Sequence, residues 1–233
     1  MNILAVIPAR GGSKGIPKKN LIKLLDKPLI VYTIEAAKLS KKISKLVLTT
    51  DDQEIASIGR EFNLEVIKRP PELSTDFASS HSAILHAYRY VLTSSYKPDA
   101  VLTLQPTSPL RTSLHIDESI NIFQKNEDAD CLVSCIKLPH IFNPESIMKL
   151  NNRGYLNNYL DGSQITRRQD KDVYYARNGA AIYLTRSKSI NKFIFGGNIL
   201  PYIMNEIDSI DIDNREDVLK AELFLKYREN KIN

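Results

Sequence analysis

The sequence is poor in cysteine. Its 233 residues include two, Cys131 and Cys135. In an extended strand, residues four positions apart lie roughly 13 Å apart, which is too far for a disulfide. A metal site would need more ligands nearby than the sequence offers around them. We therefore expect both cysteines to be buried thiols of a cytoplasmic protein.

The sequence also lacks long apolar runs, internal repeats and low-complexity tracts. No run approaches the ~20 residues that span a membrane, so we expect no membrane partner. Arg10 and Lys14 interrupt the N-terminal apolar run, and we therefore expect no secretory signal. What is present is 42% hydrophobic residues, enough for a substantial core and one α/β domain.

The charge is moderately positive, with 32 basic and 27 acidic residues and a net charge of +5. Acidic residues are spread between the basic ones along the whole chain. An excess of this kind fits a polyanionic small substrate. We expect no nucleic-acid partner.

Near the N-terminus, an apolar run is followed by a loop rich in glycine and cations. Residues 3–7 have the length and β-branched content of a buried strand, and the sequence ARGGSKG follows at 9–15. Glycines let a phosphate approach the backbone closely, and N–H groups and cations supply compensating charge. The loop has the parts of a polyphosphate cradle; the alternative is a flexible surface turn. Its spacing fits neither a P-loop nor a dinucleotide fingerprint.

Strand-like and helix-like segments alternate over the first 130 residues. Apolar runs that are typical of strands occur at 3–7, 45–50, 64–67 and 100–104. Helical spacing occurs at 28–39, 53–62, 79–92 and from Ser113 onward, where Ser113 can cap the helix. Such alternation indicates an α/β fold with a mostly parallel, doubly wound sheet.

The pattern changes after Cys131. Residues 138–178 are rich in Asn, Pro, Arg, Asp and Tyr and have weak periodicity, which indicates an excursion from the sheet. From residue 202 we predict a strand through 212 and a closing helix over 215–228.

Two acidic residues, Asp211 and Asp213, lie in the sequence DSIDID at 208–213. On a strand they would point to the same face, where they could hold one Mg²⁺. Burying both without a cation would cost several kcal/mol. The alternative is a solvated edge or a cap cluster for the last helix.

Three more polar segments are candidates for binding: KRPPELSTDFASS at 68–80, LQPTSPLR at 104–111, and RRQD at 167–170 with YYARNGAAIY at 174–183. In the first, Arg69 beside two prolines is held in an extended segment, or is an ordinary surface arginine. From its residues alone, the second is only a loop. The paired arginines of the third suit a carboxylate or phosphate, or a salt-bridged hairpin.

Taken together, these segments resemble the acylneuraminate cytidylyltransferases, the CMP-sialic acid synthetases and their relatives for legionaminic, pseudaminic and Kdo-type sugars. ARGGSKGIPKKN is similar to the family's N-terminal signature, and SIDIDNREDVLKAE to its C-terminal metal motif. RPPELSTDFASS and LQPTSPLR lie between them in the family's order. The resemblance covers residues 3–222.

The resemblance implies a three-layer, Rossmann-like nucleotide-diphospho-sugar transferase fold. Its nucleotidyltransferase core would comprise residues 1–137 and 180–233. Residues 138–179 would form a dimerisation and substrate-binding excursion that reaches into the partner's site. The expected assembly is a homodimer.

The activity that the resemblance implies is transfer of CMP from CTP to the anomeric hydroxyl of a nonulosonic acid, with release of pyrophosphate. Asp211 and Asp213 would bind Mg²⁺ and, with Arg10 and Lys19, act in catalysis; Asp213 is the first candidate for the general base. The expected CTP contacts are Ala9, Arg10, Gly11, Gly12, Ser13, Lys14, Lys19, Asn20, Arg69 and Ser80. The expected contacts to the sugar acid are Gln105, Arg168 and Tyr183.

Two departures from the family pattern bear on specificity. The spacing between Asn178-Gly179 and Ile182-Tyr183 is one residue longer than usual, which shifts the register of Arg177 and Asn178. Residues 140–147 lack the lysine that many sialic acid synthetases place there, which leaves room for a legionaminate-type substrate. The alternatives are a CMP-Kdo synthetase or another sugar nucleotidyltransferase, and a non-catalytic nucleotide-binding module.

Overall fold

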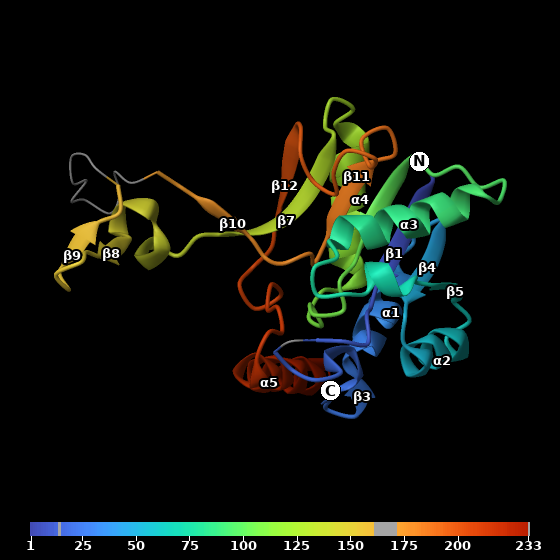
Figure 1. Cartoon of the computed structure of the whole chain (residues 1–233), viewed down its shortest axis with the longest axis horizontal. Coiled ribbons are helices and arrows are strands. Elements are labelled where there is room, and N and C mark those ends of the chain that lie inside the picture. Colours follow the sequence, from blue (N-terminus) through green and yellow to red (C-terminus); the bar gives the residue numbers. More distant parts are fainter. Residues whose placement is uncertain (14, 161–171, 233) are drawn as a thin grey trace.

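The computed structural model describes residues 1–13, 15–160 and 172–232. It shows an α/β body from which one segment projects (Figure 1). The strands are β1 Ile3–Pro8, β2 Lys23–Leu24, β3 Lys27–Pro28, β4 Lys45–Thr50, β5 Glu65–Lys68, β6 Ala100–Thr103, β7 Cys131–Lys137, β8 Met148–Leu150, β9 Leu156–Asn158, β10 Tyr175–Arg177, β11 Tyr183–Arg186 and β12 Ile199–Ile203. The α-helices are α1 Leu29–Leu39, α2 Gln53–Glu61, α3 Ser80–Leu92, α4 Ser113–Lys125 and α5 Arg215–Ile232; short 3₁₀ turns are η1 Lys19–Leu21, η2 Pro71–Leu73, η3 His140–Phe142 and η4 Pro144–Ser146.

The main sheet has the strand order β10-β7-β11-β6-β1-β4-β5, and β12 pairs with β7. The pairs that join β6, β1, β4 and β5 are parallel, as is the pair of β7 with β12, while β10 and β11 run antiparallel to their neighbours. The predicted mostly parallel α/β sheet is therefore confirmed. Parallel strands bring their carboxyl ends to one edge, which is where such sheets bind ligands.

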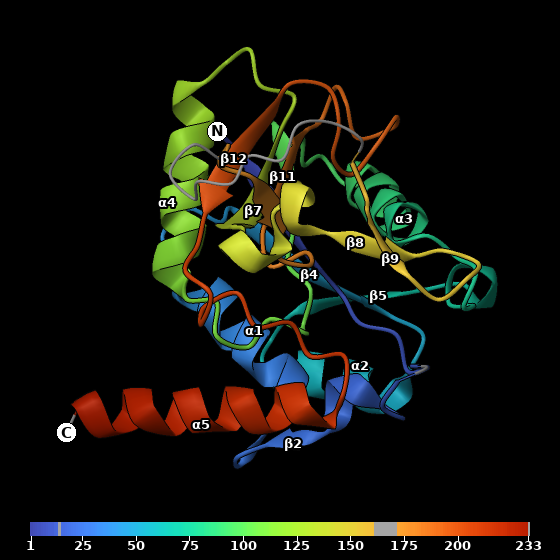
Figure 2. The same cartoon turned by 90° about the vertical axis from the view of Figure 1, so that its left-hand side faces the viewer.

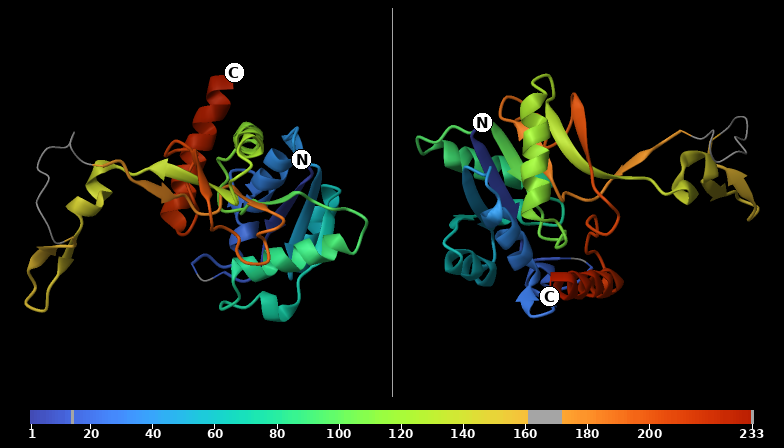
Figure 3. Two further views of the ribbon diagram at one scale, coloured as in Figure 1. Left: turned by 90° about the horizontal axis from the view of Figure 1, so that it is seen from above. Right: turned by 180° about the vertical axis from the view of Figure 1, so that it is seen from behind.

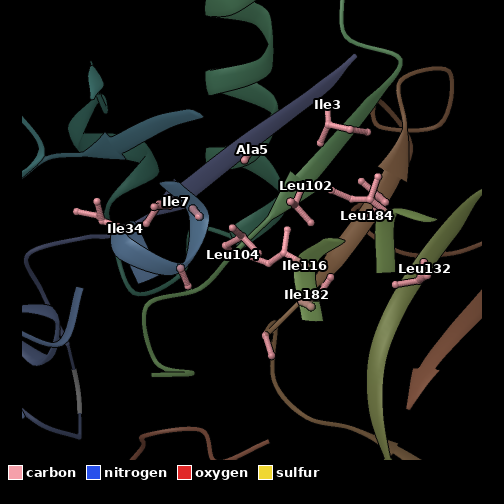
Figure 4. Close-up of a cluster of buried hydrophobic side chains, with 14 of the residues drawn as sticks. Ile3, Ala5, Ile7, Ile34, Leu102, Leu104, Ile116, Leu132, Ile182 and Leu184 are labelled. Atoms are coloured by element: carbon pink, nitrogen blue, oxygen red, sulfur yellow. The ribbon is translucent and has the colours of Figure 1, made fainter. Parts of the chain in front are cut away.

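Helices cover both faces of the sheet, which gives the predicted three layers. Alternate residues of β1 point to opposite faces, so Ile3, Ala5 and Ile7 pack with α1, α2 and α4 (Figure 4). Leu4 and Val6 pack with α3 on the other face. Figure 2 shows α4 and α3 on either side of the strands. Because both faces are covered, β1 is apolar throughout, the pattern of a strand buried on both sides.

The projecting segment, called the arm here, comprises the described residues 138–160 and 172–174. It contains η3, η4 and the small antiparallel sheet of β8 and β9 (Figures 1 and 3). Its large apolar side chains are exposed: Ile141, Phe142, Ile147, Met148, Leu150, Tyr155, Leu156, Tyr159, Leu160 and Val173. The strand that follows it, β10, pairs with β7 and so belongs to the main sheet.

Three local predictions were wrong in detail. The strand expected through residue 212 ends at Ile203, and residues 204–214 form a loop. The last helix continues to Ile232 rather than 228. The cap of α4 is Thr112 rather than Ser113, and its hydroxyl accepts from the His115 N–H.

Both cysteines lie buried and free in β7, as predicted. Among the described helices, none is long and apolar enough to cross a bilayer.

Candidate active site

A cavity of about 410 Å³ opens at the carboxyl ends of β1, β5 and β6. Its lining includes seven of the predicted CTP contacts: Arg10, Gly12, Ser13, Lys19, Asn20, Arg69 and Ser80. Gln105, predicted for the sugar acid, and Asp213, predicted for the metal, line it as well, beside Pro8, Gly15, Leu73, Thr75, Asp76, Ala78, Ser79, Ala83, Pro106 and Thr107. The predicted contacts Ala9 and Gly11 are not among the lining residues. Segments that are far apart in the sequence thus line one cavity. The predicted contact Lys14 lies outside the described residues.

The loop after β1 is held by the two aspartates at the start of α2. The N–H of Gly11 donates to Asp51 Oδ1 at 3.0 Å, and Asp52 caps α2 by accepting from two backbone N–H groups. A Cβ on Gly11 would lie 2.7 Å from Asp52 Oδ2, so this close approach requires glycine. At the two ends of the loop, the Ala9 N–H donates to Thr49 and the Asn20 amide donates to the Arg10 carbonyl. Residues 9–11 at the start of the loop are therefore held in place by backbone contacts.

Two cations of this loop face acidic partners across the cavity. Arg10 Nη1 lies 2.9 Å from Asp76 Oδ1 and donates to the Thr75 carbonyl. Lys19 Nζ lies 2.9 Å from Asp213 Oδ1 and donates to the Ile212 carbonyl at 2.7 Å. Both ion pairs are partly exposed, so an incoming polyanion could exchange with the carboxylates at modest cost.

Arg69 forms a buried positive wall of the cavity. It is only 5% exposed, and its Nη2 donates to the Thr49 carbonyl at 2.9 Å while its Nε has no partner. Burial lowers the pKa of this guanidinium to about 10, which still leaves it charged at neutral pH. A buried cation with an unused donor is stabilised when an anion binds beside it. The surface-arginine alternative is therefore wrong.

The N-terminus of α3 also faces the cavity. Ser79 caps the helix by accepting from the Ser82 N–H at 3.1 Å, and Ser80 is the first helical residue. Both serines line the cavity, together with Ala83 one turn later. Helix N-termini carry partial positive charge and unpaired N–H groups, which favours anions.

The loop after β6 carries Gln105 and Thr107 and is anchored from below by Arg111. The Arg111 guanidinium is fully buried and donates to the carbonyls of Gln105 and Ala181 and to the Thr33 hydroxyl. Burial lowers its pKa to about 9, an effect that Asp211 opposes. The buried Arg111 side chain therefore fixes the backbone of Gln105, which an ordinary exposed loop would leave free.

Asp211 and Asp213 sit in the loop before α5, so the predicted same-face placement on a strand is wrong. Burial raises the pKa of Asp211, and the nearby negative charge of Asp213 raises it further. The Asp211 Oδ1 and the Thr107 hydroxyl are both buried without a hydrogen-bond partner. Asp213 is exposed and lines the cavity.

These two carboxylates fit a divalent cation. A buried carboxylate oxygen without a donor, beside a second carboxylate, is the arrangement that a hard cation stabilises. No group of three or more His, Cys, Asp or Glu ligands gathers in the described part of the chain. A bound Mg²⁺ would therefore take its remaining ligands from water and substrate phosphates, which is its usual mode.

The residues predicted for the sugar acid are less closely grouped. Gln105 lines the cavity, whereas Tyr183 is buried and is not among the lining residues. The Tyr183 hydroxyl accepts from Arg177 Nη1 at 3.2 Å, and its ring packs on Phe195. Arg177 also stacks on Phe195 at 4.1 Å from the ring centroid. Arg168 lies outside the described residues.

Four positioning residues were not among the predicted site residues: Asp51, and Thr107, Arg111 and Gly179, which lie within the quoted motifs. Gly179 has φ +70°, and a Cβ there would lie 2.6 Å from Asp211 Oδ2. Gly179 belongs to the Asn178-Gly179 pair, and a glycine in such a pair often adopts positive φ. Its backbone conformation could therefore have been predicted from the sequence. The other three act through contacts between distant segments, which composition does not reveal.

Comparison with known proteins places this geometry among nucleotidyltransferases. A family model described as cytidylyltransferase matches residues 4–196. The N-acylneuraminate cytidylyltransferase of Escherichia coli O18:K1:H7 is 39% identical over 92% of this chain and 50% of its own length. The CMP-N,N'-diacetyllegionaminic acid synthase of Legionella pneumophila is 34% identical over 93% of both chains.

The chain thus spans about half the length of the N-acylneuraminate enzymes that it matches, such as those of E. coli and Streptococcus agalactiae. Among solved structures, CMP:2-keto-3-deoxy-manno-octonic acid synthetase complexed with CTP superposes with a TM-score of 0.72 over 98% of this chain and 100% of that one. At 16% identity, that likeness shows the fold alone.

Proposed function

The chain belongs to the cytidylyltransferase family, and we propose that it transfers CMP from CTP to the anomeric hydroxyl of a sialic acid-like nonulosonic acid, releasing pyrophosphate. The observation that carries this proposal is one cavity lined by three cations, Arg10, Lys19 and Arg69, and by Asp213, with the Asp211 carboxylate close to Asp213. A non-catalytic nucleotide-binding module would have little need of a buried, unpaired carboxylate oxygen at Asp211 next to a cavity-lining carboxylate.

The cations would neutralise the polyphosphate. CTP carries close to four negative charges, and its triphosphate would meet Arg10, Lys19 and the N–H groups of the loop after β1. On binding, phosphate oxygens would replace Asp76 as the partner of Arg10 and Asp213 as the partner of Lys19. Arg69 and the N-terminus of α3 also line the cavity and would hold the nucleotide end.

Asp211 and Asp213 would hold Mg²⁺ against the triphosphate. When bound, the ion would polarise the phosphoryl oxygens and neutralise charge that builds up on the leaving pyrophosphate. Thr107 and Gly179 would keep Asp211 in place, because the Thr107 carbonyl holds the Ile212 N–H beside it and Gly179 leaves room for its carboxylate. Asp213 lines the cavity and stays the first candidate for the base.

The rest of the reaction is positioning and charge stabilisation, the main sources of catalysis in phosphoryl-type transfers. The anomeric hydroxyl would attack the α-phosphorus in line, forming the sugar–oxygen–phosphorus ester as the bond to pyrophosphate breaks. Gln105 would orient the sugar acid at the cavity's edge, and Tyr183 would shape the adjoining wall. No side chain needs to form a covalent bond.

We also propose a homodimer in the cytoplasm, in which Arg168 of one chain serves the sugar site of the other. The arm supports the homodimer, because it projects from the body and exposes a dense set of apolar side chains, among them Phe142 and Tyr155 (Figure 3). Isolated domains seldom expose patches of this kind without a partner. Tyr is also enriched at protein interfaces. Two free, buried cysteines suit a reducing compartment.

Pyrophosphate release tests the proposal. The purified chain is given each of the four NTPs with N-acetylneuraminate, legionaminate, pseudaminate or Kdo as acceptor. We expect release only with CTP and only with an acceptor, and we expect Asp211→Asn to lower it by roughly 100-fold or more. Asp128→Asn is the matched control, because Asp128 is exposed and outside the cavity. Preference for Kdo would favour the alternative synthetase, and no release with any pair would overturn the proposal.

A further inference from the structure

A second polar cluster lies behind the acidic pair, outside the cavity. Its centre is Asp208, which is 8% exposed and lies three residues before Asp211 in the loop before α5. Its carboxylate forms an ion pair with Arg228 of α5, accepts from the Asn205 amide at 2.5 Å, and lies 3.3 Å from His115 Nε2. None of these four side chains lines the cavity, so the proposed reaction does not use them directly.

Arg228 bridges the two loops that carry the proposed site. Its Nη2 pairs with Asp208, in the loop of the acidic pair, and its Nη1 donates to the carbonyl of Leu110 at 2.9 Å. Leu110 lies in the loop after β6, which carries Gln105 and Thr107. One guanidinium therefore fixes the distance between the two loops.

The same loops meet a second time, beside the carboxylates. The Ile212 N–H donates to the Thr107 carbonyl at 2.8 Å. The contact at Thr107 is one backbone hydrogen bond. The bridge through Arg228 joins the same two loops by an ion pair and a further hydrogen bond.

His115 adds a fixed donor to the cluster. Its Nδ1 accepts from the Thr112 N–H at 3.2 Å, and a backbone N–H can only donate. The neutral ring must therefore carry its proton on Nε2, which faces Asp208. Asp208 thus receives donors from α4, from α5 and from its own turn.

We infer that Arg228 and Asp208 are positioning residues for the acidic pair, setting where Asp211 and Asp213 stand relative to the loop of Gln105 and Thr107. The inference rests on the proposed function, in which that pair holds Mg²⁺ against CTP. Outer partners that orient metal ligands typically change metal affinity or activity by about 10- to 100-fold. The bridge should therefore affect the metal-dependent part of CTP binding and leave the metal-independent part unchanged.

The test compares four variants with the wild type. Arg228→Lys keeps the charge but cannot reach both loops with a planar fork. Asp208→Asn removes the negative charge, and Arg228→Met removes the positive one. The double variant Asp208→Asn/Arg228→Met removes both charges, which avoids leaving an unpaired buried charge and so favours a folded protein. Lys226→Met is the matched control, because Lys226 is exposed on the same helix.

Calorimetry of CTP binding, with Mg²⁺ and with EDTA, is the primary readout. In the wild type we expect Mg²⁺ to tighten CTP binding. In the folded Arg228 and Asp208 variants we expect this gain to fall by roughly 10-fold or more, with the affinity in EDTA within about twofold. In pyrophosphate release, kcat should fall while the KM for CTP at saturating Mg²⁺ changes less. Lys226→Met should match the wild type in every measurement.

Three results would overturn the inference. One is an unchanged gain from Mg²⁺ in the folded double variant. The second is a parallel loss of affinity with and without Mg²⁺, which would indicate a merely structural role. The third is a wild type whose CTP binding gains nothing from Mg²⁺. If the wild type gains from Mg²⁺ but releases no pyrophosphate with any acceptor, the proposed function fails while the calorimetric comparison still decides the role of Arg228.

Discussion

Replacing Gly179 with alanine should displace the carboxylate of Asp211 without changing a charge. The added Cβ would lie 2.6 Å from Asp211 Oδ2 and 2.9 Å from its Cγ, whereas ordinary contacts begin at 3.4 Å. The carboxylate must therefore retreat by about 3.4 − 2.6 = 0.8 Å, or the backbone of β10–β11 must shift by as much. A misplacement of about 1 Å at a reacting centre can cost on the order of 100-fold in rate, so we expect kcat to fall by roughly 10- to 100-fold.

The substitution also places alanine at φ +70°, which costs about 1–2 kcal/mol. For a chain of this length that corresponds to a fall of about 2–8 °C in Tm. Gly154→Ala is a matched control for this strain. Its φ is +80°, but nothing lies within 4 Å of the added Cβ, and it sits on the arm between β8 and β9.

The assay is pyrophosphate release as a function of Mg²⁺ concentration, with thermal melting on the same samples. We expect Gly179→Ala to need more Mg²⁺ for half-maximal rate and to turn over slowly at saturation. Gly154→Ala should keep the wild-type rate to within about twofold, since it adds strain without a clash. Wild-type kcat and Mg²⁺ dependence in folded Gly179→Ala would show that the position of Asp211 does not limit the reaction.

Three further predictions test other parts of the site. Arg10→Ala and Lys19→Ala should each lower kcat/KM for CTP by roughly 10- to 100-fold, because each removes a charge-assisted phosphate contact. Lys18→Ala is the control, because Lys18 pairs with Glu54 at 2.9 Å. Equal effects of all three substitutions would contradict the assignment. Mixing inactive Arg168→Ala with inactive Asp211→Asn should restore part of the activity if each site uses both chains of a homodimer, and no recovery despite proven subunit exchange would refute shared sites. Burial, together with the charge of Arg228, lowers the pKa of His115 below its ordinary 6.5. As the pH falls, the unfolded chain therefore binds this proton before the folded protein does. The stability that the neutral ring contributes is present above pH 6.5 and is lost as the pH falls through the folded pKa. Urea unfolding between about pH 7.5 and 5.5 should show this slope, and His115→Gln should flatten it.

Much of the fold could be predicted because apolar runs and helical spacing alternate clearly along the first 130 residues. Strand β1 and the glycine-rich loop after it could be recognised from their local sequence alone. The loop before α5 misled, because its alternating Ile210 and Ile212 imitate a strand. Both isoleucines pack instead in the cluster beneath α1 and α5, with Leu24, Leu29 and Ala221, so their burial comes from helices rather than from strand pairing.

The sequence predicted which residues belong to the candidate site, but not how deeply they are buried or which groups surround them. Arg69 precedes Pro70 and Arg111 lies two residues after Pro109, and nothing in these local sequences shows that both guanidiniums are buried. The approach of Gly179 to Asp211 joins residues 32 positions apart, which only the folded sheet brings together. The cluster of Asp208, His115 and Arg228 likewise depends on how α4 and α5 pack on the loops.

The measurement that tests the central claim most directly is the fate of the acceptor's anomeric oxygen. The nonulosonic acid that supports pyrophosphate release is labelled with ¹⁸O at its anomeric hydroxyl, and the products are analysed by mass spectrometry and ³¹P NMR. If the hydroxyl attacks the α-phosphorus of CTP in this cavity, the label bridges sugar and phosphorus in the CMP-sugar and is absent from pyrophosphate. Loss of the label from the CMP-sugar, or CMP formation without a sugar ester, would contradict the account.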